Sequence, residues 1–118
     1  MQTFTRFVYA VFGTAALAGG AGGLVRPGLL GPEVAESPLM QHLVREQAAG
    51  FIFIGLMFFW CLRHFDARRP VHLALLTFTV IFAGIHWAGS YGFAHPQVLV
   101  VNTAPALLLA ITAPWKKR

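Results

Sequence analysis

The sequence predicts an all-α integral membrane protein, a four-helix bundle with up-down-up-down topology and both termini in the cytoplasm. Of its 118 residues, 57% are hydrophobic and only 11% are charged, whereas a soluble domain usually carries about 25% charged residues. The apolar residues form long runs, and the charges gather in the short segments between them. Both patterns are typical of membrane-spanning helices, and a chain of this length has room for a single domain.

The first predicted span covers residues 4–25 and ends at the sequence RPG (Arg26–Gly28). It exceeds the about 20 residues that a helix needs to cross about 30 Å of hydrocarbon. Arg6, followed by an apolar stretch and ALAGG, also fits a signal peptide, but we expect the segment to be retained as a span. Residues 26–42 form the outer loop. Its three prolines and two glycines favour a structured turn or a short surface helix over a fifth span.

The second predicted span covers residues 43–65 and is densest in GFIFIGLMFFWCL (Gly50–Leu62). Cys61 is the only cysteine, which excludes an intrachain disulfide, and its apolar surroundings favour a buried small hydrophobe over a redox role. The phenylalanines of this span lie nearly all round the helix, so part of its surface is expected to face lipid or another subunit. They are Phe51, Phe53, Phe58, Phe59 and Phe65.

The third predicted span covers residues 71–92, after DARRP, and the fourth covers residues 97–115, before KKR. The connections before and after the third span are so short that consecutive spans must be antiparallel. Small residues at four-residue spacing on the first and third spans are typical of close helix packing. The alternative is that glycine is simply common in membrane helices. The two predicted packing rows are Ala15, Gly19 and Gly23, and Gly84, Ala88 and Gly92.

The distribution of basic residues predicts the orientation of the chain. With four spans, one side of the membrane holds seven of the nine Lys and Arg residues. The other side holds Arg26 and Arg45, together with Glu33, Glu36 and Glu46. The positive-inside rule therefore predicts that both termini are cytoplasmic. The seven basic residues of the predicted inner side are Arg6, Arg63, Arg68, Arg69, Lys116, Lys117 and Arg118.

Three polar residues lie deeper in the predicted spans. His86 is roughly 9 Å from the end of the third span, at 1.5 Å per residue, and antiparallel threading places Glu46 and Asn102 in the same outer half. Ser90 is one turn from His86 on the same face. We therefore predict a polar pocket in the outer leaflet lined by Glu46, His86, Ser90 and Asn102. The alternative is that these side chains only hydrogen-bond one another and close the bundle without a ligand.

The sequence RHFDARRP is interpreted as a charged hairpin at the cytoplasmic boundary and not as a catalytic cluster, because its side chains can reach water there. The residues concerned are His64, Asp66, Arg68, Arg69 and the nearby His72. No P-loop, dinucleotide fingerprint, CxxC, HExxH or G-x-S-x-G motif is present. No catalytic residue is assigned, and we favour a non-catalytic role.

The sequence predicts no metal site and no nucleic-acid partner. A bis-histidine haem would need a second imidazole at the depth of His86, and zinc would need three or four ligands. No cofactor is therefore required, although a single-ligand pigment at His86 stays open. The basic residues flank apolar runs and are not interleaved with aromatics, so their pattern indicates a topology signal.

The pattern resembles the DoxX-like group of small bacterial four-helix membrane proteins. The resemblance is carried by GGAGGLVRP (Gly19–Pro27), REQAAGFIFIG (Arg45–Gly55) and FAGIHWAG (Phe82–Gly89), together with the arginine-rich hairpin. Members often have an arginine near the position of His86 and an acidic residue near that of Asn102, and this chain differs from the group at both positions. The resemblance implies a four-helix bundle in the bacterial inner membrane and, for some relatives, association with oxidoreductase or quinone-linked systems.

Two classes of function follow from these observations. The first, which we prefer, is a non-catalytic accessory or scaffold subunit that packs against other membrane subunits or forms a homo-oligomer within the lipid bilayer. The second is a membrane protein that binds a quinone, a lipid or another amphiphile in the outer pocket near His86, with a redox-linked role as one version.

Overall fold

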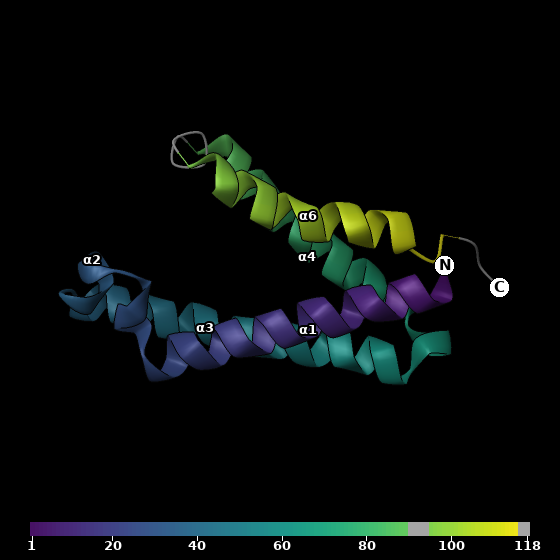
Figure 1. The fold of residues 1–118 in the computed structure, drawn as a ribbon, viewed down its shortest axis with the longest axis horizontal. Helices are drawn as coiled ribbons and strands as arrows, with labels where there is room; N and C mark the ends of the chain where they lie inside the picture. Colours follow the sequence, from purple (N-terminus) through teal and green to yellow (C-terminus); the bar gives the residue numbers. More distant parts are fainter. Residues whose placement is uncertain (90–94, 116–118) are drawn as a thin grey trace. The chain divides into compact units, whose positions relative to one another are not determined.

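The computed structural model describes residues 1–89 and 95–115, and every regular element in those ranges is helical (Figure 1). The prediction of an all-α fold is confirmed for this part of the chain. Three helices are long and apolar enough to cross a membrane, and a fourth apolar helix has 17 residues. The elements are α1 (Gln2–Val25), η1 (Pro27–Leu30), α2 (Pro32–Ala35), α3 (Pro38–Arg63), η2 (Phe65–Ala67), α4 (Arg69–Ala88) and α6 (Pro96–Thr112).

The start of α3 differs from the expected one, because the helix begins at Pro38 and not at residue 43. The hydroxyl of Ser37 accepts a hydrogen bond from the backbone N–H of Met40, with a donor–acceptor distance of 3.3 Å. This is the contact of an N-capping serine, and proline is favoured at the next position because it has no N–H to leave unpaired. The expected outer loop therefore contains η1, α2 and the first turn of α3.

The end of α6 also differs from the expected one. The helix ends at Thr112, before the predicted residue 115, and Ala113 adopts an extended conformation with ψ of 137°. A residue that precedes a proline is driven to extended backbone, and Pro114 follows directly. The expected end of the third span, at residue 92, lies outside the described residues.

The chain divides into two compact units, which are described separately. The hairpin unit comprises Tyr9–Trp60, and the terminal unit comprises Met1–Val8 with Cys61–Arg118.

In the hairpin unit, α1 and α3 lie side by side and antiparallel (Figure 1). A Cβ built on Gly13 would lie 2.9 Å from the ring of Phe59, and one built on Gly20 would lie 2.7 Å from Ile52. Moving forward along α1 thus means moving backward along α3. Glycine at these positions lets the two helices approach closely, which is the usual function of small residues between membrane helices.

The contact row on α1 differs from the predicted one. A Cβ on Gly23 would lie 2.9 Å from that of Ala48, so Gly23 does face α3. Gly19, in contrast, has no described atom within 4 Å of its built Cβ, and Ala15 is exposed. The row that faces α3 is therefore Gly13, Gly20 and Gly23, which shares only Gly23 with the predicted row. Whether Ala15 and Gly19 pack against another helix stays a prediction.

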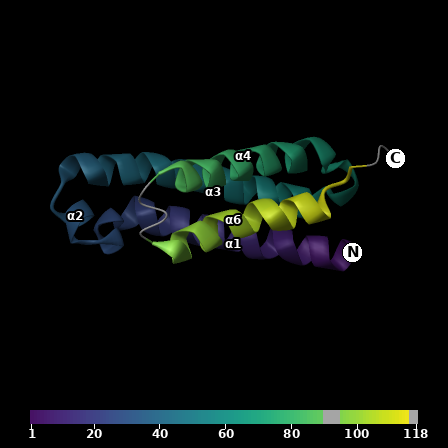
Figure 2. The same ribbon diagram turned by 90° about the horizontal axis from the view of Figure 1, so that it is seen from above.

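In the terminal unit, α4 and α6 lie side by side and antiparallel (Figure 2). His72, near the start of α4, bonds to Leu109 near the end of α6, whereas Trp87 near the end of α4 bonds to Thr103. The predicted row on α4 does not face α6: Gly84 has no described atom within 4 Å of its built Cβ, and Ala88 is exposed. Gly92 lies outside the described residues.

Candidate functional site

His86 is held by its own helix. Its Nδ1 lies 2.8 Å from the carbonyl oxygen of Phe82, one turn earlier in α4, and the two rings have their centroids 4.9 Å apart. Because the carbonyl can only accept, Nδ1 carries the hydrogen, and in the neutral ring Nε2 is then an acceptor. The imidazole is half-buried, so its orientation is fixed within α4.

Asn102 is held in the same way by α6. Its Nδ2 donates to the carbonyl oxygen of Val98 at 2.7 Å, and its side chain is half-buried. The next residue, Thr103, accepts a hydrogen bond of 2.8 Å from the indole N–H of Trp87. Because Trp87 and Thr103 adjoin His86 and Asn102, the two predicted polar residues lie at the same level of the α4–α6 pair.

The other two residues of the predicted pocket, Glu46 and Ser90, do not test whether the pocket exists. Glu46 belongs to the hairpin unit, where its carboxylate lies 3.1 Å from Nε2 of His42 one turn earlier in α3. Both side chains of this pair are about two-thirds exposed, at 64% and 68%. Ser90 lies outside the described residues. The polar pocket of Glu46, His86, Ser90 and Asn102 therefore stays a prediction.

A second group of polar side chains closes the end of α6. The last carbonyls of a helix have no partner within it. Here the carbonyl of Leu109 accepts from Nε2 of His72 at 2.9 Å, and the carbonyl of Ala110 accepts from the indole N–H of Trp115 at 3.1 Å. Arg69 donates from Nε to the carbonyl of Pro114 at 3.2 Å. His72, expected at the boundary and in reach of water, is instead fully buried because it caps a neighbouring helix.

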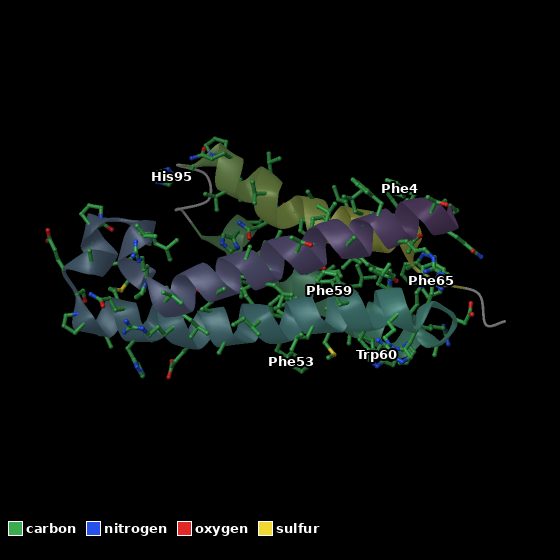
Figure 3. The ribbon with its side chains drawn as sticks, turned by 60° about the horizontal axis from the view of Figure 1, so that its bottom comes forward. Phe4, Phe53, Phe59, Trp60, Phe65 and His95 are labelled. Carbon is green, nitrogen blue, oxygen red and sulfur yellow. The ribbon has the colours of Figure 1, made fainter. Side chains whose placement is uncertain are left out.

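The basic hairpin contains a cluster that the sequence did not indicate. The ring of Phe65, only 5% exposed, has the guanidinium carbon of Arg68 at 3.7 Å and that of Arg6 at 4.3 Å from its centroid. Arg68 also donates from Nη1 to the Phe65 carbonyl. We call Arg6, Phe65 and Arg68 the arginine cluster. Figure 3 shows Phe65 beside nitrogen-bearing side chains.

The arginine cluster joins residues that are far apart in the sequence, so no local pattern predicts it. Arg6 comes from the first turns of α1, whereas Phe65 and Arg68 come from the connection between α3 and α4. The sequence predicts for these basic residues a topology signal and, for Arg68 and Arg69, a place in the charged hairpin. Of the others in that set, Arg63 is exposed at the end of α3, and Lys116, Lys117 and Arg118 lie outside the described residues.

Cys61 is fully buried. Within residues 1–89 and 95–115, no group of three or more His, Cys, Asp or Glu side chains is arranged to hold a metal ion.

These features are those of a small helical protein of the membrane-spanning class, because three of its helices are long and apolar enough to cross a lipid bilayer. The chain belongs to the family described as Domain of unknown function (DUF4345), which matches residues 4–86. The match covers α1 through most of α4 and includes His86, Glu46 and the arginine cluster. Comparisons with the curated proteins and with the solved structures found no match.

Proposed function

We propose that the chain is a non-catalytic accessory or scaffold subunit of a larger membrane complex. The observation that supports this role best is how the polar side chains of α4 and α6 are used. Each of them bonds to a helix carbonyl or to a side chain of the other helix, which is how polar groups stabilise helices and hold them together in membranes. These side chains are His72, His86, Trp87, Asn102 and Thr103.

The apolar side chains that face outward give such a subunit its contact surface. Phe53 on α3 is 61% exposed and points away from α1 (Figure 3). On α4 and α6 the exposed residues include Ile81, Ile85, Val101 and Ile111. Such a surface can pack against lipid tails or against an apolar helix of a partner subunit. A scaffold role requires that a partner cover part of it, by hetero-association or by a homo-oligomer.

The same proposal includes the arrangement in the membrane. α1, α3, α4 and α6 form an up-down-up-down bundle in the bacterial inner membrane, with both termini in the cytoplasm. The antiparallel pairs within each unit and the asymmetry of basic residues support it. α6, with 17 residues, is about 25 Å long at 1.5 Å per residue, so this span needs local thinning of the bilayer. The DoxX-like resemblance of Gly19–Pro27 supports the same class.

A second candidate function is the binding of a quinone, a lipid or another amphiphile near His86. One observation favours it: Nδ1 of His86 is fixed by the Phe82 carbonyl, which leaves Nε2 as an acceptor for a ligand hydroxyl. Asn102 at the same level offers its amide oxygen as a second acceptor, because its nitrogen is used by Val98. A quinol hydroxyl or a lipid headgroup hydroxyl has the matching chemistry.

One experiment separates the two functions. Membranes are solubilised in a mild detergent, the protein is isolated on a native gel, and all proteins and small molecules in its band are identified by mass spectrometry. The accessory role predicts other membrane subunits in a fixed ratio. A monomer that carries one amphiphile per chain contradicts it and supports the second function.

The variant His86→Ala refines that result, with His42→Ala as the control because His42 is exposed on α3. A folded His86→Ala protein that loses a bound amphiphile supports the second function. A His86→Ala protein that unfolds, while His42→Ala does not, assigns His86 a structural role.

A further inference from the structure

The arginine cluster places two positive charges against one aromatic ring. The guanidinium carbons lie 3.7 Å and 4.3 Å from the centroid of the Phe65 ring, so they are at most about 8 Å apart, within one Debye length at physiological salt. Attraction to the face of the ring offsets part of the repulsion between the two cations. Two cations are thereby held close together at the end of the α3–α4 connection.

No carboxylate neutralises these charges within the described ranges. Asp66 is the only acid in the hairpin, and it makes no ion pair there; the ion pair found among the described residues is the one between His42 and Glu46. Arg68 Nε is buried and has no hydrogen-bond partner in the described part of the chain. A buried donor on a cation without a partner is unfavourable, so the cluster is electrostatically incomplete.

A phosphate group has the chemistry that would complete it. Its oxygens accept several charge-assisted hydrogen bonds at once, and the planar guanidinium fits them in a bidentate geometry. The cluster also lies where α3 ends and α4 begins. If these two helices cross the bilayer, their junction is at the depth of the headgroups, where basic residues recognise anionic lipids. We propose that Arg6 and Arg68, held against Phe65, bind the phosphate of an anionic phospholipid.

This site goes beyond the proposed scaffold role and does not depend on a protein partner. The test uses the full chain in detergent, to which phosphatidylglycerol or phosphatidylcholine is added, and native mass spectrometry measures the lipid adducts. The expected result is that phosphatidylglycerol binds more tightly than phosphatidylcholine. Losing one charge-assisted hydrogen bond to the phosphate weakens binding about tenfold or more, so Arg6→Gln and Arg68→Gln should each show that loss.

Arg63→Gln is the matched control, because Arg63 is exposed at the end of α3 and outside the cluster, and the charge change is identical. It should bind phosphatidylglycerol as the unchanged chain does. Arg6→Gln keeps the test decisive even if Arg68→Gln fails to fold, since Arg6 is exposed. Equal loss in Arg63→Gln and Arg6→Gln would overturn the proposal, because it indicates a general charge effect.

Two further outcomes also overturn it. The first is equal affinity for the anionic and the zwitterionic lipid, which indicates a non-specific apolar contact. The second comes from inorganic phosphate alone. If inorganic phosphate stabilises the unchanged chain against heat but does not stabilise Arg6→Gln, while Arg6→Gln binds phosphatidylglycerol as the unchanged chain does, the cluster binds soluble phosphate and the lipid assignment is wrong.

Discussion

The close contact between α1 and α3 at Gly20 makes a quantitative prediction. In Gly20→Ala the new Cβ would lie 2.7 Å from a side-chain carbon of Ile52, 2.9 Å from the carbonyl oxygen of Ala48 and 3.0 Å from the backbone nitrogen of Ile52. Two of these three atoms belong to the backbone of α3. Moving one side chain therefore cannot relieve the clash, and the two helices must separate.

The expected loss is that of an overpacked core, about 1–3 kcal/mol of the free energy of unfolding. A Gly→Ala change in a helix also stabilises it, by up to about 1 kcal/mol. The control Gly22→Ala carries this second effect alone, because no described atom lies within 4 Å of its built Cβ. The difference between the two variants thus isolates the contact and amounts to about five- to 140-fold in the unfolding equilibrium constant, given 1.4 kcal/mol per factor of ten.

The assay is unfolding of the purified chain in mixed micelles by increasing SDS, followed by tryptophan fluorescence. Gly13→Ala should fall between the two, because the atoms closest to its built Cβ, at 2.9 Å and 3.1 Å, belong to the ring of Phe59, which can rotate away. Equal unfolding midpoints for Gly20→Ala and Gly22→Ala would refute the contact between α1 and α3.

Three further predictions concern the terminal unit. A double-mutant cycle of Trp87→Phe and Thr103→Val should give a coupling energy of about 0.6 kcal/mol, and at most about 1.7 kcal/mol, whereas additive effects would exclude the bond between α4 and α6. His72→Phe leaves the Leu109 carbonyl without its main hydrogen-bond donor and should lower the free energy of unfolding by about 1–3 kcal/mol. Thr77→Val is the control and should lower it less, because the Thr77 hydroxyl bonds to Leu73 of its own helix. Phe65→Leu removes the ring from two guanidinium groups and should lower the free energy of unfolding by about 1–2 kcal/mol. The control is Phe53→Leu, at an exposed position, which should cost less. An equal loss at both positions would count against the arginine cluster.

Much of the fold could be predicted from the sequence, because long apolar runs between charged segments leave few structures other than membrane-spanning helices. The ends of the helices depend on local chemistry that the apolar runs do not contain. α3 begins at Ser37 and Pro38, a capping serine followed by proline, and this signal lies before the apolar run. α6 ends at Thr112 because Pro114 restricts the residue before it, Ala113, to extended backbone.

The packing row could not be predicted, since it depends on the partner helix. A four-residue spacing favours Ala15, Gly19 and Gly23, but the bulky residues of α3 meet α1 at Gly13, Gly20 and Gly23.

The arginine cluster shows the same limit for a candidate site. Its members come from the two separate segments of the terminal unit, and only the fold brings Arg6 to Phe65. The sequence shows that Arg6 and Arg68 are basic and near helix ends, but it contains no information on their contact with the Phe65 ring.

We expect α3 to cross the membrane and to carry the arginine cluster to the cytoplasmic side. This expectation is tested most directly by cysteine labelling in a Cys61→Ser background, which removes the only native thiol. Ser37→Cys and Ala67→Cys then place one thiol before α3 and one after it. With a membrane-impermeant maleimide and intact cells, we expect Ser37→Cys to react at once and Ala67→Cys to react only after the membrane is permeabilised. Labelling of both variants from the same side would contradict the account.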